Sequence, residues 1–171
     1  LLNKVDDYLK QTDPDKIGYF AFTQKAAHEA RDRAIKKFNF TEDDLPYFRT
    51  LHSLAFRKLG LKKDQVMQER HYRDLGGISC KFSSKSEYLR MIQLAELRNI
   101  TPEQQFDLKE HTQDLERSKL TIIHNELARY KKDYSLIDFN DMITEFTKSD
   151  KSPKFDVVFI DEAQDLSLMQ W

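Results

Sequence analysis

Apolar positions recur at helical spacing along most of this chain and give way to short continuous apolar runs near both ends. Helical spacing predicts a helix over Gln24 to Phe38. Directly before it, the apolar and aromatic run Gly18 to Thr23 predicts a buried strand, and a strand followed at once by a helix is half of a βαβ unit. The clearest strand is Phe155 to Ile160, which ends on Asp161 and Glu162.

The rest of the pattern is mostly helical. We predict helices over residues 1–9, 51–59, 63–75, 85–98, 102–132 and 138–146, and a second short strand over 47–50. Thr101 as N-cap with Pro102 at the first helical position indicates a helix start, and Gly60 indicates a helix end. Both ends of the chain therefore read as α/β, with a helical block between them and too few strands for a complete sheet.

Composition and charge exclude several classes of function for this chain. The 171 residues carry 28 Lys and Arg against 29 Asp and Glu, so any nucleic-acid binding must come from a local face. The four glycines form neither GxGxxG nor GxxxxGK[ST], which excludes a glycine-rich phosphate cradle within this chain. The chain has a single cysteine, Cys80, which excludes an internal disulfide and indicates a reducing compartment. We expect Cys80 to be a buried residue without a chemical role. No apolar run approaches the roughly 18 residues of a membrane span, and the histidines lack zinc-ligand spacing.

The sharpest chemical feature is the sequence Asp161-Glu162-Ala163-Gln164-Asp165 after the last apolar strand. Carboxylates at the C-terminal end of a buried parallel strand lie where open α/β sheets bind ligands. One carboxylate there can hold Mg²⁺ through water, and its neighbour can activate a water that attacks a terminal phosphate. The alternative is that Asp161 and Glu162 cap the following helix and add an acid to its first turn.

Several segments resemble one family. Val157 to Ser167 (V-V-F-I-D-E-A-Q-D-L-S) closely resembles motif II of the UvrD/Rep-like superfamily 1 DNA helicases, with Gln170 at the position of a later family Gln. Ala21 to Ala27 resembles motif Ia, and Arg49 to Ala55 resembles motif Ib. Ile137 to Ile143 resembles the D-F-D-D-L segment that precedes motif II. The four matches occur in the family order and bracket residues 20 to 171.

The resemblance implies a catalytic constellation. Asp161 would position Mg²⁺ through water, Glu162 would activate the hydrolytic water, and Gln164 would sense the γ-phosphate of ATP. Asp165 is expected to support this network without performing chemistry. ATP and Mg²⁺ are therefore the expected cofactors.

The resemblance also implies contacts with single-stranded DNA from motifs Ia and Ib, at Phe22, Thr23, Gln24, Thr50, His52 and Ser53. A Phe22 ring can stack on a base, which is worth roughly 1–3 kcal/mol, and hydroxyl and amide groups suit phosphates. Gln24 replaces the commoner Asn. In the alternative interpretations Phe22 is a core strand residue, whereas Thr50 as a helix N-cap is compatible with a DNA contact.

The implied fold is α/β, a partial RecA-like P-loop NTPase parallel sheet with a large, mostly helical insertion. Residues 1–60 and 136–171 would belong to the RecA-like part, called 1A in the family, and residues 61–135 to the insertion, called 1B. Basic and aromatic side chains of the insertion are candidates for a DNA track or, alternatively, for a solvated helix face: Lys62, Lys63, Arg70, Tyr72, Arg73, Lys81, Phe82, Lys85, Tyr88, Arg117, Lys119, Arg129, Lys131 and Lys132.

Walker A and motifs III to VI are absent from the chain. We therefore expect a fragment of domain 1 of a cytoplasmic DNA helicase of repair or replication, inactive as an ATPase alone. Its parent would couple Mg-ATP hydrolysis to strand separation and 3′ to 5′ translocation. The expected partners are single-stranded DNA or a duplex/single-strand junction, and the rest of the helicase chain. The alternatives are a stand-alone DNA-binding module that lost catalysis and part of a RecB/AddA-like helicase–nuclease.

Overall fold

The computed structural model describes residues 1–75, 86–110 and 115–171. These residues divide into two compact units, which we describe separately. The first unit comprises residues 1–60, 145–166 and Gln170, and the second comprises 61–144, 167–169 and Trp171. Helix α8 (Phe139–Lys148) contributes residues to both. Some predictions concern residues outside the described ranges, namely the Gly76–Gly77 turn, Cys80, Lys81, Phe82 and Lys85.

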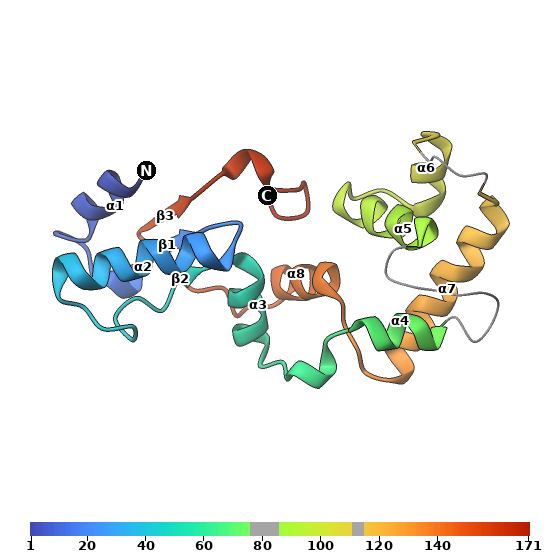
Figure 1. Ribbon diagram of the computed structural model, residues 1–171, viewed down its shortest axis with the longest axis horizontal. Helices are drawn as coiled ribbons and strands as arrows, with labels where there is room; N and C mark the ends of the chain where they lie inside the picture. The colour runs from blue at the N-terminus through green and yellow to red at the C-terminus, as the bar shows by residue number, and fades with distance from the viewer. Residues whose placement is uncertain (76–85, 111–114) are drawn as a thin grey trace. The chain divides into compact units, whose positions relative to one another are not determined.

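A parallel three-stranded sheet forms the centre of the first unit (Figure 1). The strands β1 (Ile17–Phe20), β2 (Phe48–Arg49) and β3 (Val157–Ile160) lie in the order β2-β1-β3. In register, Phe20 of β1 stands opposite Arg49 on one side and Ile160 on the other. The predicted α/β class is confirmed. Because all strands run the same way, their C-terminal ends meet at one edge of the sheet.

Two helices, α1 (Leu2–Tyr8) and α2 (Gln24–Phe38), pack into the core of this unit together with buried side chains of the sheet. The buried residues of α2 are all alanines, Ala27, Ala30 and Ala34, whose small side chains let the helix backbone approach the strands closely. Between the strands, the Tyr19 and Phe48 rings stack with their centroids 5.4 Å apart. The short 3₁₀ turn η1 (Pro14–Lys16) leads directly into β1.

Helix α3 (Leu51–Leu59) follows β2 without a loop. Its N-cap is Thr50, and it ends at Gly60, whose φ of 72° lies in the left-handed region that glycine adopts without strain. The predicted bounds of both α2 and α3 are confirmed because each helix begins at a side-chain N-cap and ends at a left-handed residue.

The second unit is built from helices. They are η2 (Lys63–Gln65), α4 (Glu69–Leu75), α5 (Glu87–Leu97), α6 (Pro102–Asp107), α7 (Arg117–Asp133) and most of α8. Their core includes Leu89, Ile92, Leu120 and Leu127. No described helix combines the length and apolar character that crossing a membrane requires.

The predicted single helix over 102–132 is wrong: α6 ends at Asp107 and α7 begins at Arg117. The apolar spacing continues through this region, but a polar network turns the chain. Arg98 Nη1 donates to Gln105 Oε1 at 2.9 Å and to Glu110 Oε2 at 2.6 Å. Lys109 lies between Gln105 and Glu110 in sequence and adopts a left-handed φ of 55°. A right-handed helix cannot continue through this conformation.

The predicted continuous helix over 63–75 is also wrong. Here tertiary pairing interrupts the helix, because Val66 forms a parallel bridge with Ile137 and Met67 N donates to Ile137 O at 2.9 Å. The first predicted strand is shorter than expected as well. It ends at Phe20, opposite the last residue of β3, and leaves Phe22 and Thr23 outside the sheet.

Candidate functional site

The predicted site residues of the first unit gather at the C-terminal edge of its sheet. Backbone hydrogen bonds hold the three chain segments in register there: Asp161 N donates to Phe20 O at 2.8 Å, and Ala21 N donates to Arg49 O at 3.3 Å. Asp161, Ala21 and Thr50 are thus the first residues beyond three adjacent strands. Segments far apart in sequence therefore present polar groups along one edge.

Asp161 is half-buried and held by a neighbour in the sheet. Tyr19 donates its hydroxyl hydrogen to Asp161 Oδ2 at 3.0 Å. Burial raises the pKa of the Tyr19 hydroxyl above its ordinary value, and the hydrogen bond and charge of Asp161 raise it further. Tyr19 therefore acts as a neutral donor that orients one carboxylate oxygen and leaves Asp161 Oδ1 for another ligand.

Glu162 and Gln164 lie beyond the strand and face solvent. Glu162 has a left-handed φ of 53°, unusual for a side chain of this kind, and the chain then turns into η4 (Ala163–Asp165). Gln164 Nε2 donates a short hydrogen bond to Glu162 Oε2. Glu162 stands at the N-cap position of η4 but makes no side-chain cap bond, and Asp161 bonds to Tyr19, so the capping interpretation of these two acids is wrong.

Motif Ia residues lie between β1 and α2. Phe22 is 58% exposed, so the interpretation of Phe22 as a core strand residue is wrong. Thr23 is the N-cap of α2, and its Oγ1 accepts a hydrogen bond from Ala26 N at 3.1 Å. Gln24, the first residue of the helix, is exposed. An exposed ring thus stands beside a helix N-terminus.

Motif Ib residues occupy the start of α3. Thr50 is 9% exposed, and its Oγ1 accepts from Ser53 N at 3.1 Å, which confirms the predicted N-cap. His52 and Ser53 are half-buried on the first turn. Thr50 therefore supports the helix through its hydroxyl oxygen and retains the hydroxyl hydrogen as a donor.

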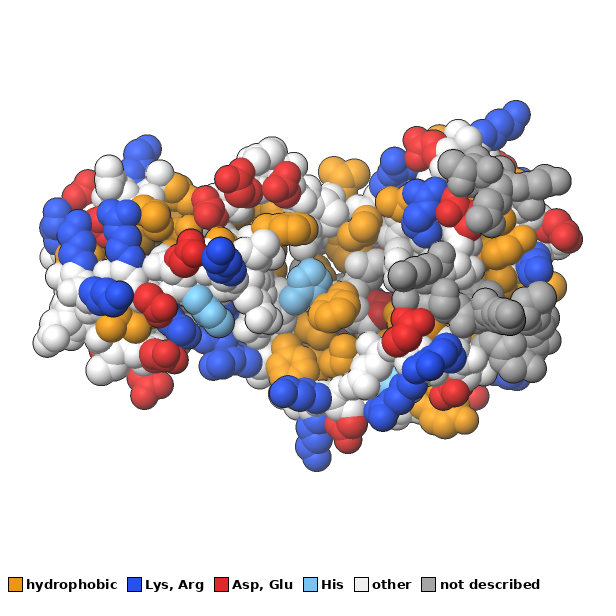
Figure 2. Space-filling view, in the orientation of Figure 1, with side chains coloured by type: hydrophobic (Ala, Val, Ile, Leu, Met, Phe, Trp, Pro, Cys, Tyr) orange, Lys and Arg blue, Asp and Glu red, His pale blue; other side chains and the backbone are white. Residues whose placement is uncertain are grey.

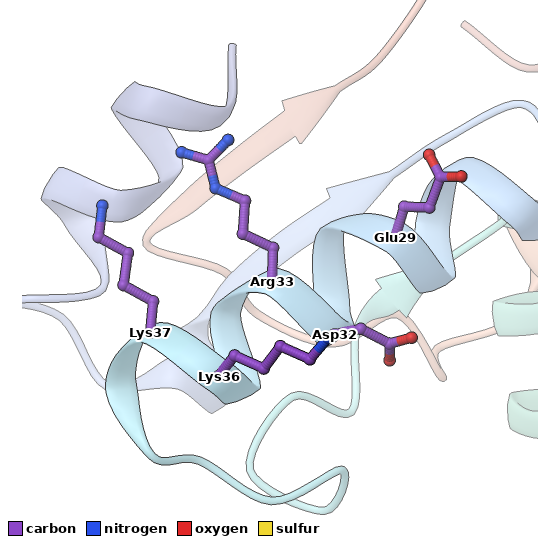
Figure 3. Close-up of a pocket in the computed structure, with 5 residues that line it drawn as sticks. All are labelled: Glu29, Asp32, Arg33, Lys36 and Lys37. Carbon is purple, nitrogen blue, oxygen red and sulfur yellow. The ribbon is translucent and has the colours of Figure 1, made fainter.

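A depression of about 520 Å³ lies along α2 and is lined by Glu29, Asp32, Arg33, Lys36 and Lys37 (Figure 3). Figure 2 shows basic and acidic side chains close together over this part of the first unit. Arg33 and Lys37 reach toward α1 and donate to Asp6 Oδ2 at 2.6 and 2.7 Å. Burial opposes the charge of Asp6, but the bonds from Lys37 and Arg33 hold its pKa below the ordinary value. These cations link two helices, and we assign the depression no ligand.

The second unit contains its own group of carboxylates. Glu96, Asp138 and Asp141 each offer an oxygen within 4.8 Å of the others. Lys131 Nζ lies 2.9 Å from Asp138 Oδ2 and 2.8 Å from Asp141 Oδ2. Burial works against its ammonium charge, but the two aspartates outweigh burial and raise the pKa of Lys131. Lys131 therefore supplies the cation for this group, and its largely buried side chain fits neither the DNA track nor the solvated helix face that the sequence left open.

Glu96 completes this group from α5. Asn140 Nδ2 donates to Glu96 Oε2 at 2.7 Å. Burial raises the pKa of Glu96, the Asn140 hydrogen bond opposes the rise, and the nearby Asp138 charge adds to it. Tyr72, another candidate for the DNA track, is also buried and lies outside any such track.

Tyr19 is the residue of the sheet edge that sequence reasoning missed. Within the strand its aromatic ring is typical of a buried position, and nothing local distinguishes it. Its partner Asp161 lies 142 positions away, so only the register of β1 against β3 brings the two together. The Lys131 group was missed for a different reason: Lys131 and Asp138 are only seven residues apart, but they meet across the turn between α7 and α8, and Glu96 joins them from α5.

A family model described as the UvrD/REP helicase N-terminal domain matches residues 1–171, the whole of the chain. A search of curated proteins finds no match.

Proposed function

Because the chain belongs to the UvrD/REP helicase family, we propose that it carries the acidic half of an ATPase site and part of a single-stranded DNA contact surface. The observation that supports this most strongly is the shared sheet edge. Asp161 follows β3 beside the segments that carry Phe22 and Thr50. One edge thereby offers carboxylates for a metal–nucleotide complex and an exposed ring for a base.

The residues present fit Mg²⁺. Its preferred ligands are oxygens, often through water, and Asp161 presents a carboxylate whose other oxygen Tyr19 already orients. In a complete site, Mg²⁺ bound to ATP supplies charge neutralisation at the phosphates. ATP itself needs a phosphate cradle, which the 171 residues do not contain.

Each acidic or amide side chain has a distinct proposed role. Asp161 holds the metal's water ligand, and Glu162 accepts a proton from the water that attacks the γ-phosphate. Exposure of Glu162 leaves it open to that water, and its left-handed backbone turns it away from the strand direction. Gln164 senses the γ-phosphate and, through its hydrogen bond to Glu162, reports the nucleotide state to the same loop. Asp165 supports the loop.

The proposed DNA contacts are Phe22, Thr23, Gln24, Thr50, His52 and Ser53. The exposed Phe22 ring stacks on a base, and the α2 N-terminus next to it attracts a phosphate. The Thr50 and Ser53 hydroxyls contact the backbone without reading sequence. The wider proposal is a cytoplasmic ATP-dependent 3′ to 5′ helicase, with a RecA-like 1A part at 1–60 and 136–171 and a 1B-like insertion at 61–135.

The direct test replaces one carboxylate in the full-length helicase that contains this chain. Glu162→Gln should lower DNA-stimulated ATP turnover by at least about 100-fold and leave ATP binding intact, because only proton transfer is lost. Asp156→Asn is the matched control, since it makes the same chemical change at an exposed residue directly before β3. Retained turnover in Glu162→Gln refutes the role of Glu162.

A second measurement tests the isolated chain. We expect the purified 171-residue chain to bind single-stranded DNA and to show no Mg²⁺-dependent ATP turnover, because it has no phosphate cradle. Measurable turnover would contradict this division of the site, and absence of DNA binding at low salt would contradict the proposed contact surface.

A further inference from the structure

The second unit contains a small cavity beside the carboxylate group that pairs with Lys131. Its volume is about 240 Å³, and its walls come from α4, from α5 and from the residues around the start of α8: Tyr72, Gln93, Leu97, Asp138, Phe139 and Asn140. All of these residues belong to the second unit. Pockets for drug-sized ligands usually measure roughly 300–1,000 Å³, so this cavity suits a single small ring system.

Tyr72 contributes a buried polar group to this cavity. Its side chain is 9% exposed, and within residues 1–75, 86–110 and 115–171 its hydroxyl makes no hydrogen bond. Burial raises the pKa of Tyr72 to about 12, and the charge of Asp138 adds to the rise, so the phenol stays a neutral donor. A buried hydroxyl without a partner loses its hydration without compensation. Tyr72 therefore calls for a hydrogen-bond acceptor that the described residues do not supply.

Two side-chain amides add further hydrogen-bonding groups to the walls. Asn140 Nδ2 donates to Glu96 Oε2 at 2.7 Å, which leaves Asn140 Oδ1 as an acceptor. The side-chain amide of Gln93 makes no hydrogen bond to any described residue, so it offers both a donor and an acceptor. The cavity thus combines a phenolic donor with amide acceptors.

The charge of Asp138 is directed to partners within the fold. Asp138 Oδ2 accepts from Lys131 Nζ at 2.9 Å, and Asp138 Oδ1 accepts from Asp141 N at 2.9 Å. The other two carboxylates of the group, Glu96 and Asp141, lie outside the cavity lining. The hydrogen-bonding groups that remain for a ligand are therefore those of Tyr72, Gln93 and Asn140, and all three are neutral.

A nucleobase matches this combination of walls. Leu97 and the ring of Phe139, which is 59% exposed, provide apolar surface against which a flat ring packs. An exocyclic amine suits the acceptors Asn140 Oδ1 and Gln93 Oε1, and a neighbouring ring nitrogen suits the Tyr72 hydroxyl. Adenine and cytosine carry an amine next to such a nitrogen, whereas thymine carries no amine.

We propose that this cavity binds one unpaired adenine or cytosine base of single-stranded DNA. The inference rests on the proposed DNA-binding function, and it adds a base-recognition site in the second unit to the contacts of the first. The cavity differs from the surface track of basic side chains, of which Tyr72 is not a part. Its available polar groups are neutral, so they receive a base and not a phosphate.

The test compares two oligonucleotides of equal length, a labelled oligodeoxycytidylate and a labelled oligothymidylate, in titrations against the purified chain at pH 8. Both contain single-ring bases, and at one salt concentration their phosphate contacts contribute equally. The wild type should bind oligodeoxycytidylate about fivefold more tightly, which is the lower end of what one well-placed base contact provides.

Tyr72→Phe, which removes only the hydroxyl, and Gln93→Met, which removes the amide, should each reduce this preference. Tyr134→Phe is the matched control, because it makes the same change on a 66% exposed ring outside the cavity lining, and it should keep the preference. Equal affinity of the wild type for both oligonucleotides, or an unchanged preference in Tyr72→Phe and Gln93→Met, refutes the base site while the proposed function stands. If the wild type binds neither oligonucleotide at low salt, the proposed function fails and this site fails with it.

Thermal unfolding separates ligand binding from a structural role. Because the Tyr72 hydroxyl bonds to no described residue, Tyr72→Phe should unfold at a midpoint equal to or above that of the wild type. A lower midpoint together with an unchanged preference for cytosine would show that the hydroxyl serves folding alone and would overturn the proposal.

Nuclear magnetic resonance locates the contact directly. The side-chain amide signals of Gln93 should shift when oligodeoxycytidylate is added, whereas those of Gln11, whose amide donates to Asp7 O in the first unit, should stay in place. Unmoved Gln93 signals in the DNA-bound chain would place any cytosine contact elsewhere and would also overturn the proposal.

Discussion

Two of the carboxylate groups described above, one in each unit, both consist of aspartate and glutamate side chains. They differ in the neighbouring group that compensates their negative charge. In the second unit, Asp138 and Asp141 share the ammonium of Lys131, whose side chain is 13% exposed and belongs to the fold itself. At the sheet edge of the first unit, Asp161 has a neutral phenol as its partner. Glu162 beside it is exposed and bonded to the amide of Gln164.

This difference separates a structural group from a candidate site. A cluster that contains its own cation gains little from an external one, because an added metal would have to displace the buried ammonium. Carboxylates held by neutral donors keep their charge for a ligand.

The largest expected effect comes from removing the resident cation. Lys131→Met should lower the free energy of unfolding by about 3–5 kcal/mol, because it leaves Asp138, Asp141 and Glu96 mutually repelling in a buried site. Urea denaturation measures the loss. Burial raises the pKa of Glu96, so protonation of Glu96 relieves part of the repulsion and the deficit should shrink as the pH falls.

Lys132→Met is the matched control for this variant, since Lys132 is the exposed neighbour on the same helix. It should change the free energy of unfolding by no more than about 0.5 kcal/mol. Equal stability of the two variants would mean that Lys131 does not hold the carboxylate group together, and the contrast drawn above would fail.

A smaller effect is expected at the sheet edge. Tyr19→Phe removes the hydroxyl that donates to Asp161 and keeps the ring stacked on Phe48. If the proposed ATPase function is correct, the Mg²⁺ concentration for half-maximal ATP turnover by a complete helicase carrying this sequence should rise by about tenfold, as for other losses of a group that orients a metal ligand.

Tyr8→Phe provides the comparison for Tyr19→Phe, because the Tyr8 ring packs against Phe159 at 5.6 Å and its hydroxyl belongs to a partly exposed side chain. It should leave the Mg²⁺ dependence unchanged. An unaltered Mg²⁺ dependence in Tyr19→Phe, together with a lower thermal midpoint, would reduce Tyr19 to a packing role.

The smallest effect sharpens the description of the second unit. Burial raises the pKa of Glu96, so the folded chain favours its protonated form and ionised Glu96 costs stability as the pH rises. Glu96→Gln should therefore be more stable than the wild type at pH 8, and the advantage should decrease toward pH 5. Thermal midpoints across this range measure it, and lower stability of Glu96→Gln at pH 8 would contradict it.

Local signals predicted much of the helical structure. Helix α2 begins after the N-cap Thr23 and ends at Asn39, and α3 begins after the N-cap Thr50 and ends at Gly60. Threonine caps helix N-termini with its hydroxyl, and asparagine and glycine adopt the left-handed conformation that ends helices. Thr101 and Gln104 form a reciprocal capping box at the start of α6. The predicted helices over 102–132 and 63–75 failed because contacts between distant residues outweighed the helical spacing of apolar positions. Arg98 hydrogen-bonds to Gln105 of α6, and Ile137 pairs with residues 65–67.

The amino-acid sequence by itself determined the α/β class and the family, and it singled out Asp161 and Glu162 as candidate site residues. All three depend on runs of neighbouring residues. Tertiary structure decided which charges were already neutralised. Asp138 and Asp161 are the same residue type. A lysine seven residues away donates to Asp138, whereas a tyrosine 142 residues away donates to Asp161. Charge compensation is a property of distance in space, and only strand register and helix packing set that distance.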